Sequence, residues 1–235
     1  MPELPEIETI RTGLEPVIVG QTVAAVHIRQ PQLRYRIPAD LDQTLRGQTI
    51  RNLQRRGKYL LLHVDRGMVL IHLGMSGSLR FVTTDQIPER HDHVDFVLDH
   101  GVLRYRDPRR FGLVLRHPAS GATHRLLEKL GPEPLGDDFT HSYLSQKGEG
   151  SKRAIKNFIM DSRVVVGVGN IYANEALFLA RIHPLRLAGT LSAQEWKELQ
   201  RNIVAVLHAG IKAGGTTLQD FVDGSGKPGY FQQQL

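Results

Sequence analysis

The chain has 235 residues, of which 40% are hydrophobic and 23% charged, a balance that excludes a largely disordered protein and leaves room for one large or two smaller domains. It contains no cysteine, which excludes disulfides, cysteine-ligated zinc and thiol catalysis. The net charge of +6 is a mild indication of a nucleic-acid partner. Because the chain has neither a long apolar run nor a basic signal-peptide start, we expect a cytoplasmic protein.

In the first half of the chain, apolar and polar residues alternate in short runs that are typical of strands. After an opening helical stretch, we expect strands at 22–29, 48–54, 59–64, 68–73, 78–82, 93–99, 102–106 and 113–116. Turn-forming triplets such as Asp65-Arg66-Gly67 separate neighbouring runs. This spacing is typical of an antiparallel sandwich or barrel.

The second half has a helical pattern. Ser192 and Glu195 form a capping box ahead of apolar residues at helical spacing, and 170–181 is a second helix candidate. The stretch 131–138, rich in glycine and proline, is either a linker or a tight connection. We therefore predict an α+β protein with two domains, a β-rich domain at 1–130 and a helical domain at 131–235.

Basic residues concentrate between residues 29 and 58, where eight of them face only two acidic residues. Two interpretations stay open. The cluster is either an ordinary solvated face of a sheet or a surface that follows phosphates, where each cation that releases a counterion adds affinity. The eight residues are Arg29, Arg34, Arg36, Arg46, Arg51, Arg55, Arg56 and Lys58.

The N-terminus carries a candidate nucleophile. Removal of the initiator methionine would expose Pro2, whose secondary amine can attack a sugar C1′ and form an iminium that acts as an electron sink. Glu3 stands next to it and can move a proton, and Glu6 follows. Proline and glutamate are also simply good residues for starting a helix. If Met1 stays in place, Pro2 is an amide nitrogen and cannot attack.

Three later motifs favour contact with nucleic acid. Lys58 leads into an apolar strand, where it can hold a phosphate, act as an acid or only extend along a sheet edge. Met75, Arg109 and Phe111 could form a wedge, in which apolar groups replace a base and arginine bonds the orphaned partner, although lone Met and Phe are more often core residues. A glycine turn at 166–169 opens onto a helix whose first N–H groups suit a phosphate.

Five motifs, in this order and register, resemble the bacterial formamidopyrimidine-DNA glycosylase family, whose members are also called 8-oxoguanine DNA glycosylases. They are MPELPEIE at 1–8, LGMSG at 73–77, DPRRFG at 107–112, GVGNIY at 167–172 and GKPGYF at 226–231. The resemblance runs from residue 2 to residue 235. The sister endonuclease VIII branch begins Pro-Glu-Gly-Pro and lacks the wedge, so Leu4, Met75 and Phe111 favour the branch that acts on oxidised purines.

The resemblance implies a fold and a mechanism. The fold is a two-layered β-sandwich flanked by helices, followed by a helical domain with a helix-two-turns-helix motif. The damaged nucleotide would be flipped out of the duplex. Pro2 would displace the base and form a Schiff base, Glu3 would donate the proton that opens the sugar, and Glu6 would support the site. Lys58 would be the acid in β-elimination and a phosphate ligand. The same resemblance implies glycosylase and abasic-site lyase activities with β,δ-elimination. It also implies action as a monomer, without a diffusible cofactor.

The resemblance also implies a set of DNA contacts. A third family position that is basic in relatives falls at Ser151, and Lys152 could take over its role. The loop that folds over the extruded base corresponds to residues around Thr217, Gly226 and Tyr230. The remaining contacts, to phosphates or through the wedge, are His72, Met75, His91, Arg109, Phe111 and Asn170.

The chain departs from the family pattern at its C-terminal end. Relatives continue into a four-cysteine zinc finger whose arginine contacts phosphates and assists δ-elimination, whereas this sequence stops at Leu235 and has no cysteine. His91-Asp92-His93 is a poor substitute as a metal site, because neighbouring strand residues point to opposite faces. We therefore expect no metal in this chain, weaker DNA binding and impaired turnover. Whether the finger is lost by truncation or naturally stays open.

Two alternatives belong to other functional classes. The chain could be a catalytically inactive protein that binds damaged DNA, having kept the nucleophile sequence but lost catalysis together with the finger. The positive net charge taken alone would also be compatible with an RNA-binding β-domain followed by a helical segment. Only the enzyme forms a reducible covalent adduct through Pro2, and only the RNA-binding protein would ignore damage in DNA.

Overall fold

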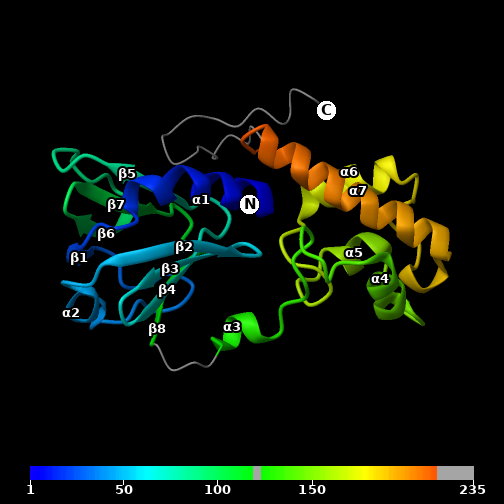
Figure 1. Cartoon of the computed structure of the whole chain (residues 1–235), viewed down its shortest axis with the longest axis horizontal. Helices are drawn as coiled ribbons and strands as arrows, with labels where there is room; N and C mark the ends of the chain where they lie inside the picture. The colour runs from blue at the N-terminus through cyan, green and yellow to red at the C-terminus, as the bar shows by residue number, and fades with distance from the viewer. Residues whose placement is uncertain (119–122, 216–235) are drawn as a thin grey trace. The chain divides into compact units, whose positions relative to one another are not determined.

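The computed structural model describes residues 1–118 and 123–215 (Figure 1). It divides into two compact units. The sheet unit holds residues 1–2, 6–118 and 213–215, and the helical unit holds residues 3–5 and 123–212. The predicted α+β fold with antiparallel sheets and a helical C-terminal part is confirmed. Within the described ranges, no helix is both long and apolar enough to cross a membrane.

The sheet unit contains two four-stranded antiparallel sheets, and each predicted strand is present. One sheet has the order β1 (Val23–Ile28), β6 (Asp92–Leu98), β7 (Gly101–Arg106) and β5 (Ser78–Val82). The other has the order β2 (Ile50–Arg56), β3 (Tyr59–Val64), β4 (Gly67–His72) and β8 (Leu113–His117). A short helix, α2 (Leu41–Leu45), precedes β2.

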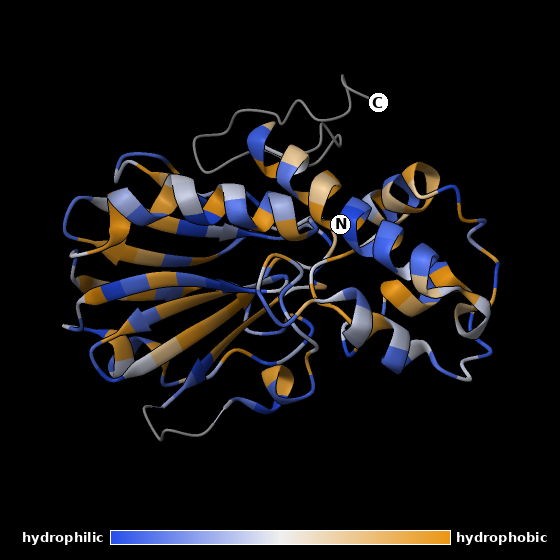
Figure 2. Cartoon of the chain, turned by 45° about the vertical axis from the view of Figure 1, so that its right-hand side comes forward, coloured by the Kyte–Doolittle hydropathy of each residue, from blue (hydrophilic) through white to orange (hydrophobic). Residues whose placement is uncertain are grey.

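Apolar side chains from both sheets and from α1 (Leu4–Ile18) build one core. In α1, Ile7, Ile10, Leu14 and Ile18 recur at helical spacing, and each is at most 1% exposed. Figure 2 shows hydrophobic residues distributed along the strands of both sheets. Strands β6 and β7 are buried along almost their whole length, with only Val97 and Arg106 partly exposed, so the connecting loops are the parts that stay available for a site.

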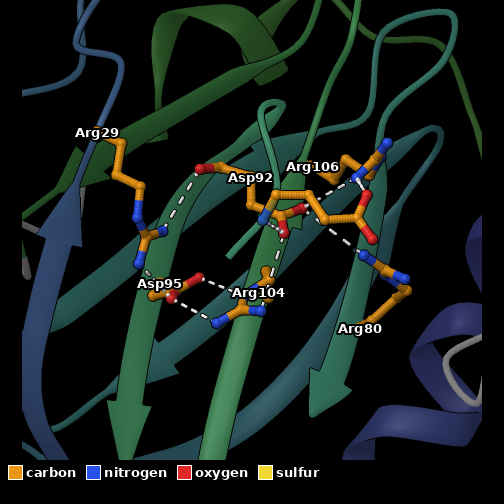
Figure 3. Close-up of polar contacts among 7 residues, drawn as sticks. Arg29, Arg80, Asp92, Asp95, Arg104 and Arg106 are labelled. Atoms are coloured by element: carbon orange, nitrogen blue, oxygen red, sulfur yellow. Dashed lines mark hydrogen bonds and ion pairs between the residues drawn. The ribbon is translucent and has the colours of Figure 1, made fainter. Parts of the chain in front are cut away.

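A network of buried charges lies on β6 and β7 (Figure 3). Arg104 binds Asp95 through Nε and Nη2, both at 2.9 Å, and Arg29 Nη2 lies 2.7 Å from the same carboxylate. Burial alone would raise the pKa of Asp95, but the hydrogen bonds from Arg104 and Arg29 outweigh it and the pKa lies below its ordinary value. Asp92 faces Arg80 and Arg104 in the same network.

The helical unit follows the predicted pattern. The capping box is confirmed, because Ser192 N–H donates to Glu195 Oε2 at 2.8 Å and Glu195 N–H donates to Ser192 Oγ at 3.3 Å. The predicted second helix is also present. The helices are α3 (Arg125–Glu128), α4 (His141–Gly148), α5 (Ile155–Ile159), α6 (Asn170–Leu179), the short η1 (Ala188–Thr190) and α7 (Ala193–Lys212).

The stretch 131–138 is a tight connection. Gly131 N–H donates to the Ser162 carbonyl at 2.8 Å, and Val166 N–H donates to the Pro132 carbonyl at 3.2 Å. These bonds tie the segment to the turn that leads into α6. The predicted domain boundary at residue 130 stays a prediction.

Candidate functional site

The carboxylate of Glu3 lies on the N-terminus of α6. Its Oε2 accepts from Gly169 N–H at 2.7 Å, and its Oε1 accepts from Ile171 N–H at 2.9 Å. Glu3 is only 2% exposed. The first N–H groups of a helix have no partner within the helix, and the helix dipole favours a negative charge there. The glycine turn predicted as a phosphate site therefore holds a carboxylate of the same chain.

The glycines of this turn make room for the N-terminal segment. A Cβ on Gly169 would lie 2.5 Å from Glu3 Oε1. Gly167 adopts φ +83°, and a Cβ there would lie 2.6 Å from the Leu4 side chain. Leu4 N–H also donates to the Gly167 carbonyl at 3.0 Å. The motif at 167–172 thus forms the binding site, or seat, of the Glu3 and Leu4 side chains. The sequence alone did not indicate this contact.

Pro2 and Glu3 occupy adjacent positions in the chain, so the candidate nucleophile is bonded directly to the residue that α6 orients. Pro2 is buried, and Met1 before it is 46% exposed. Glu6 is buried as well, at 1% exposure. A secondary amine at Pro2 next to an oriented carboxyl group is a suitable pair for attack and proton transfer.

Lys58 and His72 lie at neighbouring strand ends in the sheet unit. Lys58 follows Gly57 in the β2–β3 turn, and Tyr59 pairs with His72 across β3 and β4 with ring centroids 4.9 Å apart. His72 Nδ1 accepts from Gly74 N–H at 3.0 Å, so the neutral ring carries its proton on Nε2. Burial, with the charges of Lys58 and Arg34, lowers the pKa of His72 to about 4. Near neutral pH, His72 is an uncharged N–H donor.

The three predicted wedge residues lie on two loops that touch. Met75 and Phe111 are 41% and 47% exposed, which is unusual for large apolar side chains, and Arg109 Cζ lies 4.9 Å from the Phe111 ring centroid. A Cβ on Gly74 would lie 2.5 Å from Gly112 N, so the glycines allow the loops to approach. Exposed apolar groups beside an arginine are suited to insertion into stacked bases.

Asp107 joins these loops and was missed by the sequence analysis. It is 0% exposed; its Oδ2 accepts from Gly112 N–H at 2.8 Å and from Tyr105 Oη–H at 3.2 Å. Its Oδ1 accepts from Ser76 Oγ–H at 3.3 Å, on the loop that carries Met75. The only local signal was its place just before Pro108, a typical turn start.

The remaining DNA-contact candidates are divided between the units. Asp107 N–H donates to the His91 carbonyl at 3.1 Å, which places His91 beside the wedge loops, whereas Asn170, Ser151 and Lys152 belong to the helical unit. Asn170 and Lys152 are exposed, and Ser151 is half-buried. Thr217, Gly226 and Tyr230 lie outside the described residues.

The His91-Asp92-His93 segment serves structural contacts. His93 Nε2 donates to the Asp107 carbonyl at 2.8 Å, and Asp92 belongs to the arginine network. Among residues 1–118 and 123–215, no group of three or more histidine, aspartate, glutamate or cysteine side chains could hold a metal ion.

Comparison with known proteins identifies the family. The family model for the formamidopyrimidine-DNA glycosylase N-terminal domain matches residues 1–114. The model for the formamidopyrimidine-DNA glycosylase H2TH domain matches residues 130–222. The chain belongs to the formamidopyrimidine-DNA glycosylase family. This confirms the predicted resemblance and the helix-two-turns-helix motif.

Relatives and solved structures of the formamidopyrimidine-DNA glycosylase (Fpg) family agree with this assignment. The chain is 56% identical over 235 residues to the Cellvibrio japonicus enzyme, matching all of this chain and 87% of the relative. A Lactococcus lactis Fpg mutant, solved with a Fapy-dG-containing DNA, has a TM-score of 0.93 at 34% identity over 100% of this chain and 87% of that chain. The MutM (Fpg) protein of Thermus thermophilus has a TM-score of 0.89 at 38% identity over 99% of this chain and 85% of that chain.

Proposed function

We propose that this Fpg-family protein removes oxidised purines, such as 8-oxoguanine and formamidopyrimidines, from duplex DNA and then cleaves the strand at the abasic site. The observation that carries the proposal is the seating of Glu3 on the N-terminus of α6, one residue after Pro2. The relatives' names and the DNA in the Lactococcus lactis complex support the choice of substrate.

The reaction would begin at Pro2 once Met1 has been removed. The proline nitrogen attacks C1′ of the flipped nucleotide and the bond from C1′ to the base breaks, with the electron pair leaving on the base. The proline nitrogen passes the proton that it loses to the Glu3 carboxylate, and Glu3 delivers this proton to the ring oxygen as the sugar opens, which leaves an iminium between C1′ and the Pro2 nitrogen. Backbone N–H donors from Gly169, Ile171 and Tyr172 hold the Glu3 carboxyl group in one orientation for this transfer.

Strand cleavage would follow from the iminium. Its positive charge acidifies the C2′ proton, and loss of that proton expels the 3′ phosphate in β-elimination. Lys58 would neutralise or protonate the departing phosphate, with His72 Nε2–H and Asn170 as further phosphate ligands. Four further points remain predictions from the sequence. They are a second elimination step (δ-elimination), action as a monomer, a cytoplasmic location and independence of a bound metal.

The wedge would explain how the lesion leaves the helix. Met75 and Phe111 would fill the space of the extruded nucleotide, and Arg109 would bond the base left opposite. Because Asp107 holds both wedge loops, the inserted side chains need little reorganisation on binding.

Borohydride trapping tests the proposal. The protein, with loss of Met1 verified by intact mass, is incubated with duplex DNA containing 8-oxoguanine opposite cytosine, and borohydride is added. We expect a covalent complex whose DNA-modified peptide contains Pro2. The Pro2→Glu variant, whose bulky second residue retains the methionine, should give no adduct.

Two outcomes would contradict the proposal. An adduct that maps to another residue would remove Pro2 from its role as nucleophile. Binding of the damaged duplex without an adduct, in protein that has lost Met1, would instead favour the alternative of a catalytically inactive damage-binding protein. A preference for RNA would favour the RNA-binding alternative.

A further inference from the structure

Ion pairing divides the basic cluster between residues 29 and 58. Half of its eight members bind carboxylates of the same unit and so have no charge left over for a partner. For these four, the ion pairs speak against the interpretation as a surface that follows phosphates. The pairs are Arg29–Asp95, Arg46–Asp42, Arg51–Asp65 and Arg55–Glu8.

Arg34 differs from these four residues. Its side chain is exposed, its nearest aromatic contact is the Tyr35 ring at 5.7 Å, and no carboxylate within the described chain pairs with it. An exposed arginine without an acidic partner, in a cluster of which half the members are ion-paired, is a candidate for binding an external anion.

The loop that carries Arg34 is held firmly. Leu33 and Ile37, on either side, are 4% and 1% exposed and belong to the core of the sheet unit. Ile37 N–H donates to the Pro31 carbonyl at 2.9 Å, and Gln32 pairs with Arg36 across the loop. The backbone at Arg34 is therefore presented in one conformation, which lowers the entropic cost of binding a ligand.

This loop adjoins the proposed DNA-binding residues. Arg34 N–H donates to the Gly112 carbonyl at 3.1 Å, directly after Phe111 of the wedge. The charge of Arg34 also acts on the rings of Tyr59 and His72, and Lys58 acts on His72 as well.

We propose that Arg34 binds a backbone phosphate of duplex DNA beside the wedge loops, as a further cationic contact next to Lys58 and His72. The inference rests on the proposed function, because it requires that this face of the sheet unit binds DNA. Guanidinium suits this role, since its fork of donors matches two phosphate oxygens. The contact would position the duplex and carry no base information.

The salt dependence of DNA binding tests this contact. The probe is a duplex with a tetrahydrofuran abasic analogue, which cannot be cleaved through the iminium. Each phosphate contact contributes about 0.9 to the slope of log K against log salt, so Arg34→Ala should reduce the slope by about that amount. Across a fourfold rise in salt, the wild type should then lose about 3.5-fold more affinity than the variant.

Arg51→Ala is the matched control, because it removes the same charge from an exposed arginine that is already paired, at 2.7 Å, with Asp65. Arg51 stands at the start of β2, whereas Lys58 follows the end of that strand. We expect the control to keep the wild-type slope, Arg34→Lys to restore most of it, and all variants to melt like the wild type. Equal slopes for Arg34→Ala and Arg51→Ala, with tight wild-type binding, would overturn the Arg34 contact alone. Failure of the wild type to bind the duplex would overturn the proposed function together with it.

Discussion

Glu3 is held in place by glycines that come more than 160 residues later in the chain. Its carboxylate occupies N–H groups that every helix leaves unpaired at its start, so its orientation follows from α6 rather than from its own segment. The lack of side chains at Gly167 and Gly169 is what permits this approach. Substitutions at these glycines should therefore change the position of the Glu3 carboxyl group, the proposed proton donor.

Gly169→Ala should lower the rate of base release sharply. The new Cβ would lie 2.5 Å from Glu3 Oε1, so the carboxylate must move, and a displacement of about 1 Å can cost about 100-fold in rate. Single-turnover release of 8-oxoguanine measures the effect. Gly13→Ala in α1 is the control, because nothing lies within 4 Å of its new methyl group. Wild-type rates for Gly169→Ala would show that the seat does not orient Glu3.

His72 should make the protein sensitive to acid. Burial, with the nearby cations, lowers its folded pKa from 6.5 to about 4, so in this window the unfolded chain binds the proton more readily. The contribution of His72 to stability is full above pH 6.5 and is lost as the pH falls from 6.5 towards 4. At pH 5 the loss would be at most about 2 kcal/mol.

Urea denaturation of the wild type and of His72→Gln at pH 7.5 and pH 5 measures this loss. The variant cannot take up the proton, so its free energy of unfolding should fall less between the two pH values than that of the wild type. The exposed His100 at the β6–β7 turn provides the control variant His100→Gln, which should behave like the wild type. Parallel pH profiles for wild type and His72→Gln would contradict the expected role of burial.

At the scale of elements, the two wedge loops depend on a buried aspartate that follows β7. Asp107 accepts hydrogen bonds from a backbone N–H after Phe111, from Tyr105 and from Ser76, which lie on different segments. These bonds make the loops a single rigid structure. They also compensate the cost of burying a charged side chain completely.

Asp107→Ala should destabilise the protein and weaken discrimination between damaged and intact DNA. The substitution leaves Gly112 N–H buried without its acceptor, at about 1–3 kcal/mol, and leaves Tyr105 Oη–H with only the His72 carbonyl at 3.3 Å. Thermal melting and the ratio of affinities for abasic and intact duplex measure the two effects. Asp99→Ala, which removes an exposed carboxylate that binds Thr22 N–H, is the control. A folded Asp107→Ala protein with unchanged discrimination would mean that the wedge does not need this support.

At the scale of the whole molecule, the net charge of +6 matters less for DNA binding than which cations contact phosphates. Many arginines of the sheet unit are neutralised by carboxylates, either at the surface or in the buried network of Figure 3. Only cations that release counterions from DNA contribute to the salt dependence of binding. The cations proposed or predicted to contact phosphates are Arg34, Lys58 and Lys152, whereas Arg109 is assigned to a base.

Three such contacts predict a slope of about −2.7 in log K against log salt, or a loss of about 40-fold in affinity between about 50 and about 200 mM salt. Fluorescence anisotropy with an abasic-analogue duplex measures the slope directly. A loss of about fourfold or less would mean that at most one of these cations touches a phosphate.

The sequence alone determined the local elements and the family. The strands were predictable because alternation of apolar residues is a local pattern, and the capping box because its two members lie three residues apart. The wedge candidates and the N-terminal pair could be named because they stand in short, continuous motifs.

Only the tertiary structure decided which groups meet. The contact between Glu3 and α6, the role of Asp107 between two loops and the ion pair of Arg29 with Asp95 each join distant parts of the chain. The glycine turn predicted to bind phosphate binds Glu3 instead, because the N–H groups at the start of α6 are already occupied by this carboxylate of the same chain. Such contacts leave no periodic or local signal in the sequence, since they depend on how the chain brings separate segments together.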